Sequence, residues 1–262
     1  MSSPDYWLKF LGTAGARVVV AKQLRASGGI WAHFAGSNLM IDPGPGTLVR
    51  ALASKPKLDP SKLDAILLSH RHLDHSADAN IVADAMTNGG WQKRGCLFAP
   101  SDALDNEPVV YSYLRKAMQV ETLREGGRYQ LADLSFSAPL RMKHGVETYA
   151  LKFDLPFGTL CLIPDTEFFP EIIERCRADI IILNLLRYEP HKDPAIQHLS
   201  LADGEHLIRD LKPRLAVITH FGMTMLKAKP WEVAGQLTAQ TGVKVLAARD
   251  GLTLTLPEAL TS

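Results

Sequence analysis

The stretch LLSHRHLDH, residues 67–75, decides the fold of this chain. It places three histidines and one aspartate within six residues, directly after the nearly continuous apolar run Leu63–Ser69. Such a run predicts a buried central strand. Alternation along the strand puts His70 and His72 on the same side, and Asp74 and His75 follow where the chain turns into a helix. One short turn therefore offers two pairs of ligands to two adjacent cations.

Histidine nitrogens and carboxylate oxygens without thiolates suit Zn²⁺, and they also bind Mn²⁺ or Fe²⁺. A single histidine in a polar loop is ordinarily a surface group, whereas an HxHxDH pattern directly after an apolar strand is typical of a metal site. We therefore expect two divalent metal ions as cofactors, with Zn²⁺ as the first choice.

Strand patterns dominate both ends of the chain, and helical patterns follow the strands in the second half. Helical spacing predicts a helix over Ser76–Met86, capped by Ser76 and stopped by Gly89. Further elements are predicted as strands over residues 6–11, 30–34, 38–41, 179–185, 215–219, 243–247 and 252–256, and as helices over 168–177, 201–211 and 230–242. No Pro/Gly/Ser-rich linker interrupts the chain, so we expect one domain over residues 1–262, built from two packed sheets with helices outside.

The HxHxDH run is the signature of the metallo-β-lactamase superfamily, and the chain resembles that family from about Leu8 to Leu256. The segment Asn38–Gly46 is similar to the family's strand and Asp-Pro-Gly turn beneath the site. The resemblance implies an α/β fold, namely a four-layer αββα sandwich of two mixed β-sheets. It also implies a histidine after the middle strands and an aspartate and a last histidine at the ends of two later strands.

The resemblance implies seven metal ligands in two groups joined by a bridge: His70, His72 and His144 for the first ion, Asp74, His75 and His220 for the second, and Asp165 between them. It further implies that a hydroxide between the ions attacks the substrate. Oxygen- and nitric-oxide-reducing relatives carry a glutamate at the position of His72, so the chain resembles the hydrolases of the superfamily instead.

His198 stands 22 positions before His220, and Ser200 follows it two positions later. In the tRNase Z branch of the superfamily, which includes small phosphodiesterases, a histidine at that distance binds phosphate and protonates the leaving group. The resemblance thus makes His198 a candidate general acid, and with Asp74 it forms our candidate catalytic pair. A purely structural role before the helix at Leu201 is the alternative for His198.

Two features depart from the tRNase Z pattern. That branch has a glutamate three residues before the bridging aspartate, which orients the histidine, and here Leu162 occupies the position. We expect Asp193 to orient His198 instead. Asp165 follows His144 by only 21 positions, which leaves no room for the family's tRNA-binding arm.

The composition of the chain limits the kinds of partner that we expect it to bind. A formal net charge of +1 gives no broad basic surface for nucleic acid, so tRNA is disfavoured and a small anionic molecule is expected. No segment approaches the roughly 18 apolar residues that cross a membrane, and the N-terminal residues lack a signal-peptide pattern. Three dispersed cysteines are typical of reduced thiols, so we expect a cytoplasmic protein. Self-association into a homo-oligomer stays open.

Three function classes remain. The first is a dinuclear hydrolase of a small phosphodiester, and the second is a hydrolase of carboxylic esters, thioesters or lactones on the same centre. The third is a redox iron protein or a non-catalytic scaffold, against which His72 and the full set of ligand types argue.

Overall fold

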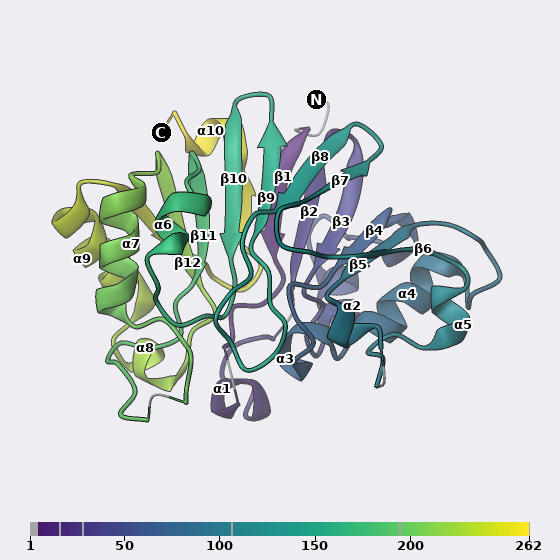
Figure 1. Cartoon of the computed structure of the whole chain (residues 1–262), viewed down its shortest axis with the longest axis horizontal. Coiled ribbons are helices and arrows are strands. Elements are labelled where there is room, and N and C mark those ends of the chain that lie inside the picture. Colours follow the sequence, from purple (N-terminus) through teal and green to yellow (C-terminus); the bar gives the residue numbers. More distant parts are fainter. Residues whose placement is uncertain (1–4, 16, 28, 106, 194, 262) are drawn as a thin grey trace.

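The computed structural model describes residues 5–15, 17–27, 29–105, 107–193 and 195–261. Two seven-stranded sheets lie face to face in the centre of the molecule, and helices cover both outer faces (Figure 1). The first sheet runs in the order β14 (Thr253–Thr255), β1 (Tyr6–Phe10), β2 (Ile30–Phe34), β3 (Ser37–Ile41), β4 (Ala65–Leu67), β5 (Cys96–Ala99) and β6 (Gln119–Thr122). The second runs in the order β13 (Lys244–Ala247), β12 (Leu215–Thr219), β11 (Ile180–Asn184), β10 (Gly158–Ile163), β9 (Leu151–Leu155), β8 (Leu134–Ala138) and β7 (Gly127–Leu131).

Each sheet is mixed. In the first, β3 to β6 pair in parallel and β14, β1, β2 and β3 pair antiparallel. In the second, β10 to β13 pair in parallel and β7 to β10 pair antiparallel. The predicted fold class, a four-layer αββα sandwich of two mixed sheets, is confirmed.

The helices of the described residues include two 3-10 turns, η1 (Pro60–Lys62) and η2 (Ser101–Ala103). The α-helices are α1 (Val18–Ala21), α2 (Thr47–Ala53), α3 (Leu73–Ser76), α4 (Ala79–Thr87), α5 (Ser112–Arg115), α6 (Glu171–Arg175), α7 (Leu201–Leu211), α8 (Met223–Lys227), α9 (Pro230–Thr241) and α10 (Leu256–Ala259). None of them is long and apolar enough to cross a membrane.

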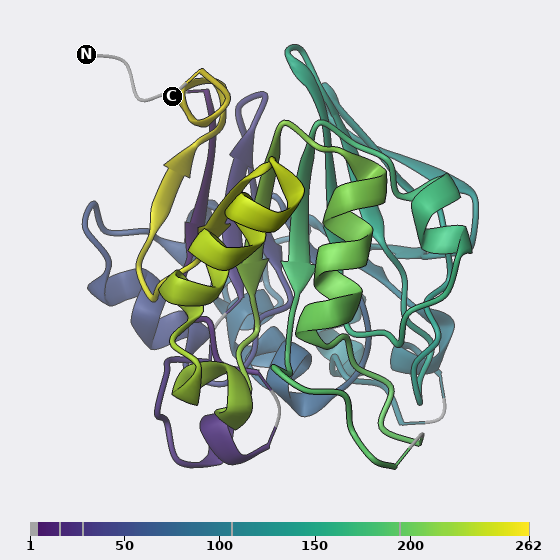
Figure 2. The same ribbon diagram turned by 90° about the vertical axis from the view of Figure 1, so that its left-hand side faces the viewer.

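Three hydrophobic clusters fill the three interfaces between the four layers. The central cluster lies between the sheets, where the rings of Phe34 on β2 and Phe153 on β9 meet with centroids 5.5 Å apart. A second packs β10 to β13 against α6, α7 and α9, which cover the outer face of that sheet (Figure 2). A third packs the first sheet against α2 and α4. The apolar run of β4 follows from this layering, because Ala65 and Leu67 face the other sheet while Ile66 faces the helices.

The predicted helix Ser76–Met86 is wrong in its boundaries, because two helices replace it. Ser76 ends α3, and its hydroxyl donates to the carbonyls of Arg71 and His72 instead of capping a following helix. The helix α4 ends before Asn88, which adopts the left-handed conformation one residue ahead of Gly89. The break lets the first short helix hold the residues after β4 in place while the second covers the sheet.

The carboxyl ends of several strands meet at one edge of the sandwich. The strands β3, β4, β10 and β12 end there, followed by Asp42, His70, Asp165 and His220 respectively. Figure 1 shows this edge at the bottom, where α1, α3 and α8 lie. Residues from both sheets therefore converge on a single site.

Candidate metal centre

The first group of predicted ligands comes from two segments of the chain. His70 and His72 follow β4, and His144 lies in the connection between β8 and β9. One ligand atom of each lies within 4.8 Å of the others, and His144 Nε2 stands 3.1 Å from His72 Nδ1. The structure thus brings all three predicted ligands of the first ion together.

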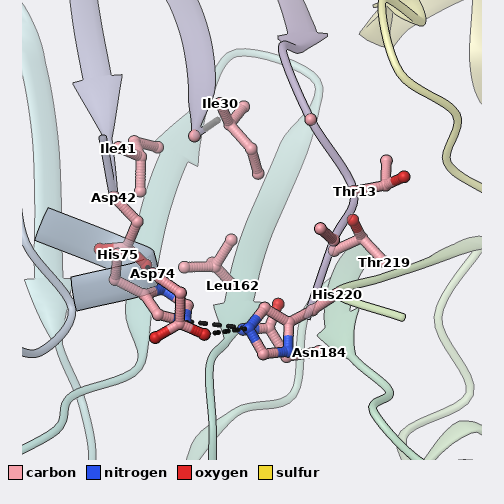
Figure 3. Close-up of a pocket in the computed structure, with 13 residues that line it drawn as sticks. Thr13, Ile30, Ile41, Asp42, Asp74, His75, Leu162, Asn184, Thr219 and His220 are labelled. Atoms are coloured by element: carbon pink, nitrogen blue, oxygen red, sulfur yellow. Dashed lines mark hydrogen bonds and ion pairs between the residues drawn. The ribbon is translucent and has the colours of Figure 1, made fainter. Parts of the chain in front are cut away.

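The second group lies directly beside it. Asp74, His75, Asp165 and His220 also offer atoms within 4.8 Å of one another. The Nε2 atoms of His75 and His220 face each other at 3.0 Å, and an oxygen of Asp74 lies 3.4 Å from His220 Nε2. Figure 3 shows Asp74 and His75 pointing across the site toward His220.

Asp165 reaches both groups. One of its oxygens lies 3.6 Å from His75 Nε2, and the carboxylate also forms a cluster with His144 and His198. His198 Nδ1 is 3.6 Å from Asp165 Oδ2, and its ring centroid is 5.1 Å from that of His144. His198, named from sequence as a catalytic candidate, therefore lies at the site and not in a remote helix cap.

The hydrogen bonds of three histidines fix which ring nitrogen carries the proton. Ser69 Oγ donates to Asp42, so it accepts from His70 Nδ1–H. The Gln197 carbonyl accepts from His144 Nδ1–H at 3.1 Å. The Asp42 carboxylate accepts from His75 Nδ1–H at 3.0 Å. In the neutral form of each ring, the Nε2 atom therefore carries the lone pair and faces the site.

Several polar atoms at this place are buried without a hydrogen-bond partner among the described residues. They are His70 Nε2, Asp74 Oδ2 and His220 Nδ1. Leaving such atoms unpaired in the interior is costly, and converging lone pairs and carboxylates repel one another unless a cation lies between them. The donor set of imidazole and carboxylate fits divalent metal ions, and Zn²⁺ in particular.

Burial and mutual charge favour the metal-binding forms of His70 and Asp165, whereas they favour a protonated His75. Burial lowers the pKa of His70 well below its ordinary value, so its ring is neutral. Burial opposes ionisation of Asp165, but His220 and His75 outweigh it and hold the pKa of this carboxyl well below its ordinary value. Burial likewise lowers the pKa of His75, but Asp74 and Asp165 outweigh it and raise this pKa well above its ordinary value. A cation bound here takes the place of that proton.

Asp42 supports the site without having been assigned a role from sequence. Its Oδ1 accepts from the Ser69 N–H at 2.7 Å, and its Oδ2 accepts from Ser69 Oγ and His75. Its position in the Asp-Pro-Gly turn after β3 is visible in the sequence, but its contact with His75 is not, because the two residues are 33 positions apart. Asn184, at the carboxyl end of β11, similarly donates from Nδ2 to Asp165 Oδ1 at 2.9 Å.

Close backbone packing and a strained backbone conformation fix the position of His220, the last of the predicted ligands. His220 has a positive φ of 62°, a conformation that costs energy in a residue with a side chain. The N–H of Phe221 donates to Thr13, and that of Gly15 donates to Phe221, which ties this turn to the first β-strand's extension. A side chain at Gly15 would overlap the His220 carbonyl, so only glycine allows this approach.

Three further residues, Arg71, Leu162 and Asp193, differ in their contacts near the site. Arg71 points out of the site, and its guanidinium pairs with Glu107 at 3.5 Å, as a structural salt bridge would. Leu162 is buried between the sheets and does not orient His198. The expectation for Asp193 is wrong, because its carboxylate accepts from the Ala195 N–H in an exposed turn while the ring of His198 faces Asp165. Nearness in sequence does not fix side-chain direction in a loop.

Two cavities adjoin the centre. A small one of about 40 Å³ is lined by Asp74, His75 and His220 together with Thr13 and Leu162 (Figure 3). A larger one of about 580 Å³ opens in front of His72, His144 and His198. Only the larger one has room for a substrate.

Comparisons with known proteins agree with this geometry. The model of the family described as beta-lactamase superfamily domain matches residues 37–221. An uncharacterized protein of Methanocaldococcus jannaschii, MJ1374, is 32% identical over 257 residues, which cover 94% of each chain. A ribonuclease Z of Methanopyrus kandleri is 28% identical over 152 residues, covering 57% of this chain and 50% of that protein.

Solved structures share the fold over nearly the whole chain. The metallo-beta-lactamase fold protein YhfI from Bacillus subtilis superposes with a TM-score of 0.77 at 17% identity, covering 96% of this chain and 99% of the other. A diphosphatase from the PhnP family superposes with a TM-score of 0.72 at 21% identity, covering 95% and 97%. Together with the sandwich of two mixed sheets and the paired His/Asp groups, these matches show that the chain belongs to the beta-lactamase superfamily domain family and has the metallo-β-lactamase fold.

Proposed function

We propose that this protein is a dinuclear metal-dependent hydrolase that cleaves a small phosphodiester. The observation that carries the proposal is the position of His198, whose ring stands 3.6 Å from Asp165 and beside the first ligand group without belonging to either set of predicted ligands. A protonatable side chain at this place is what cleavage of a diester with a poor leaving group requires.

The predicted ligands would hold two divalent ions. His70, His72 and His144 would bind the first; Asp74, His75 and His220 would bind the second; and Asp165 would contact both. Zn²⁺ is the proposed metal, with Mn²⁺ or Fe²⁺ as alternatives. When bound, such ions supply a Lewis acid for a phosphoryl oxygen and lower the pKa of water toward ~7.

His198 would bind the substrate and deliver a proton. Burial lowers the pKa of His198 to about 4, so the free ring is neutral and donates a hydrogen bond through its single N–H. A phosphodiester anion beside the ring favours the imidazolium, because an opposite charge within a few ångströms raises the pKa of a histidine. The proton would then pass from the ring to the leaving oxygen.

The size of the site supports a small substrate. The cavity of about 580 Å³ before the two ligand groups falls in the usual range for small-molecule sites. Only 21 positions separate His144 from Asp165, and most of them form β9 and β10. We therefore propose a small anionic molecule as the substrate and do not propose tRNA.

A substrate panel tests the reaction class. Purified enzyme with Zn²⁺ should hydrolyse bis-p-nitrophenyl phosphate, and a thioester and lactone panel of matched concentration should be turned over more slowly. His198→Ala should lower diesterase activity, while His206→Ala, which removes an exposed histidine on α7, should not. Faster hydrolysis of a thioester or lactone, unaffected by the His198 substitution, would instead favour the ester-hydrolase alternative.

A further inference from the structure

The large cavity carries a charge pattern that the proposed chemistry does not use. Besides His72, His144 and His198, two arginines line it, Arg187 and Arg17. Its described lining contains no aspartate or glutamate, and no ion pair joins either arginine to a carboxylate of the described residues. The cavity therefore carries the positive charge of two arginines, which no carboxylate of its described lining neutralises.

Arg187 is poised for a ligand. Its Nε is buried and has no hydrogen-bond partner among the described residues. A buried guanidinium N–H without an acceptor is unfavourable, and a planar guanidinium matches phosphate or carboxylate through two parallel hydrogen bonds. An acceptor from outside the chain would satisfy this donor.

The backbone around Arg187 is held on both sides. Its own N–H donates to the carbonyl of Leu199, next to His198, and the carbonyl of Leu186 accepts from Gly222. The N–H of Tyr188 donates to Thr224 Oγ1 at 3.1 Å. The fixed backbone anchors the Arg187 side chain in the cavity wall, so no backbone entropy is lost there when a ligand binds.

We propose that Arg187, assisted by Arg17, binds a second anionic group of the substrate, so that the enzyme selects a phosphodiester bearing a terminal phosphate or carboxylate on one arm. This inference rests on the proposed function for the position of the diester at the two ligand groups. Arg187 would act as a specificity residue that recognises the part of the substrate that does not react.

Three matched substrates test it: ethyl p-nitrophenyl phosphate and its analogues with a phosphomonoester or a carboxylate at the end of the ethyl chain. In the wild-type enzyme the KM of a charged analogue should be about 10–100-fold lower than that of the ethyl compound, as expected for charge-assisted hydrogen bonds. The better of the two analogues identifies the anion. Arg187→Ala should remove the preference, Arg187→Lys should retain part of it, and Arg128→Ala, at an exposed site on β7, should retain all of it.

Two results would overturn the inference while leaving the proposed function standing. One is equal KM for all three substrates in the wild-type enzyme. The other is a loss in Arg187→Ala that is the same for all three, which would place the guanidinium on the scissile group.

If none of the substrates is cleaved, the proposed function fails, and binding still decides the inference. Calorimetry with ethyl phosphate and ethane-1,2-diyl bisphosphate should show the bisphosphate binding at least about 10-fold more tightly to the wild-type protein, and Arg187→Ala should abolish the difference. Equal affinities in the wild-type protein would refute it.

Discussion

Single hydrogen bonds control the chemistry of individual histidines in this centre. Ser69, Asp42 and the Gln197 carbonyl each hold one Nδ1–H and turn the opposite nitrogen inward. Such partners commonly matter for metal affinity nearly as much as the ligands themselves, because they set the ring's orientation and basicity.

Asp42→Asn tests this idea at the second ligand group. The amide keeps the size of the side chain but removes the negative charge that His75 Nδ1–H contacts. We expect metal affinity to fall by about 10–100-fold, measured by competition with a chromophoric chelator. Asp64→Asn serves as the control, since Asp64 accepts from the Asn38 backbone N–H away from the site. Unchanged affinity in Asp42→Asn would mean that His75 needs no such support.

A second residue-scale prediction concerns the proton that His198 would deliver. His198→Ala should retain both metal ions while lowering the turnover of a cyclic nucleotide diester, whose leaving group is an alkoxide, by about 10²–10⁴. A p-nitrophenyl diester should lose less, because p-nitrophenolate leaves without a proton. Equal losses for both substrates would indicate phosphate binding alone.

At the scale of elements, the turn after β3 and the short helix α3 touch through their backbones. A methyl group at Gly44 would overlap the carbonyl oxygen of Asp74, so Gly44→Ala must push α3 away from β3. We expect a loss of about 1–3 kcal/mol in the free energy of unfolding and weaker binding at the second ligand group. Denaturation of the metal-free protein measures the loss of stability, and the metal content of the purified protein measures the weaker binding.

Gly235→Ala is the matched control for this substitution. Gly235 lies in α9 with open space around it, so alanine there should stabilise by about 0.4–1 kcal/mol through the unfolded chain. A similar small gain at Gly44 would show that α3 is free to move and does not depend on this contact.

Elements with strong local signals were predicted closely from the sequence. The helix α7 spans Leu201–Leu211 as expected, because Ser200 and Asp203 form a reciprocal capping box. The helix α9 begins at Pro230 as expected and ends at Thr241, one residue before the left-handed Gly242. The helices α2 and α8 were not predicted. They are short, of seven and five residues, and their placement depends on packing against the sheets more than on local periodicity.

The candidate site was predictable where ligands cluster in sequence or end a buried strand. The run from His70 to His75 and the strand-ending Asp165 and His220 satisfy that condition. The roles of Asp42 and Asn184 depend on contacts with residues far away in the sequence, namely Ser69 and His75 for Asp42 and Asp165 for Asn184. A single sequence does not encode such distances. The same reason explains why Asp193 was predicted to orient His198, whereas Asp165 is the residue that faces its ring.

For the whole molecule, metal should contribute to stability. A ligand that binds only the folded state at about 1,000 times its Kd stabilises by about 4 kcal/mol, and each kcal/mol raises Tm by about 2–4 °C for a chain of this size. Protein purified without added metal should contain about two first-row ions per chain. A strong chelator should lower its Tm by ~10 °C, reversibly on adding Zn²⁺. An unchanged Tm after complete removal of metal would contradict this expectation.

The predicted ligands come from both halves of the chain, and this division affects how the two halves are held together. The contact of His72 with His144 closes a loop of 72 residues, and that of His75 with His220 closes one of 145. Covalent cross-links that close loops of such lengths remove about 4–5 kcal/mol of entropy from an unfolded chain. Metal ions bound between the two halves would act as removable cross-links. The stability of the contact between the halves would therefore depend on the concentration of free metal around the protein.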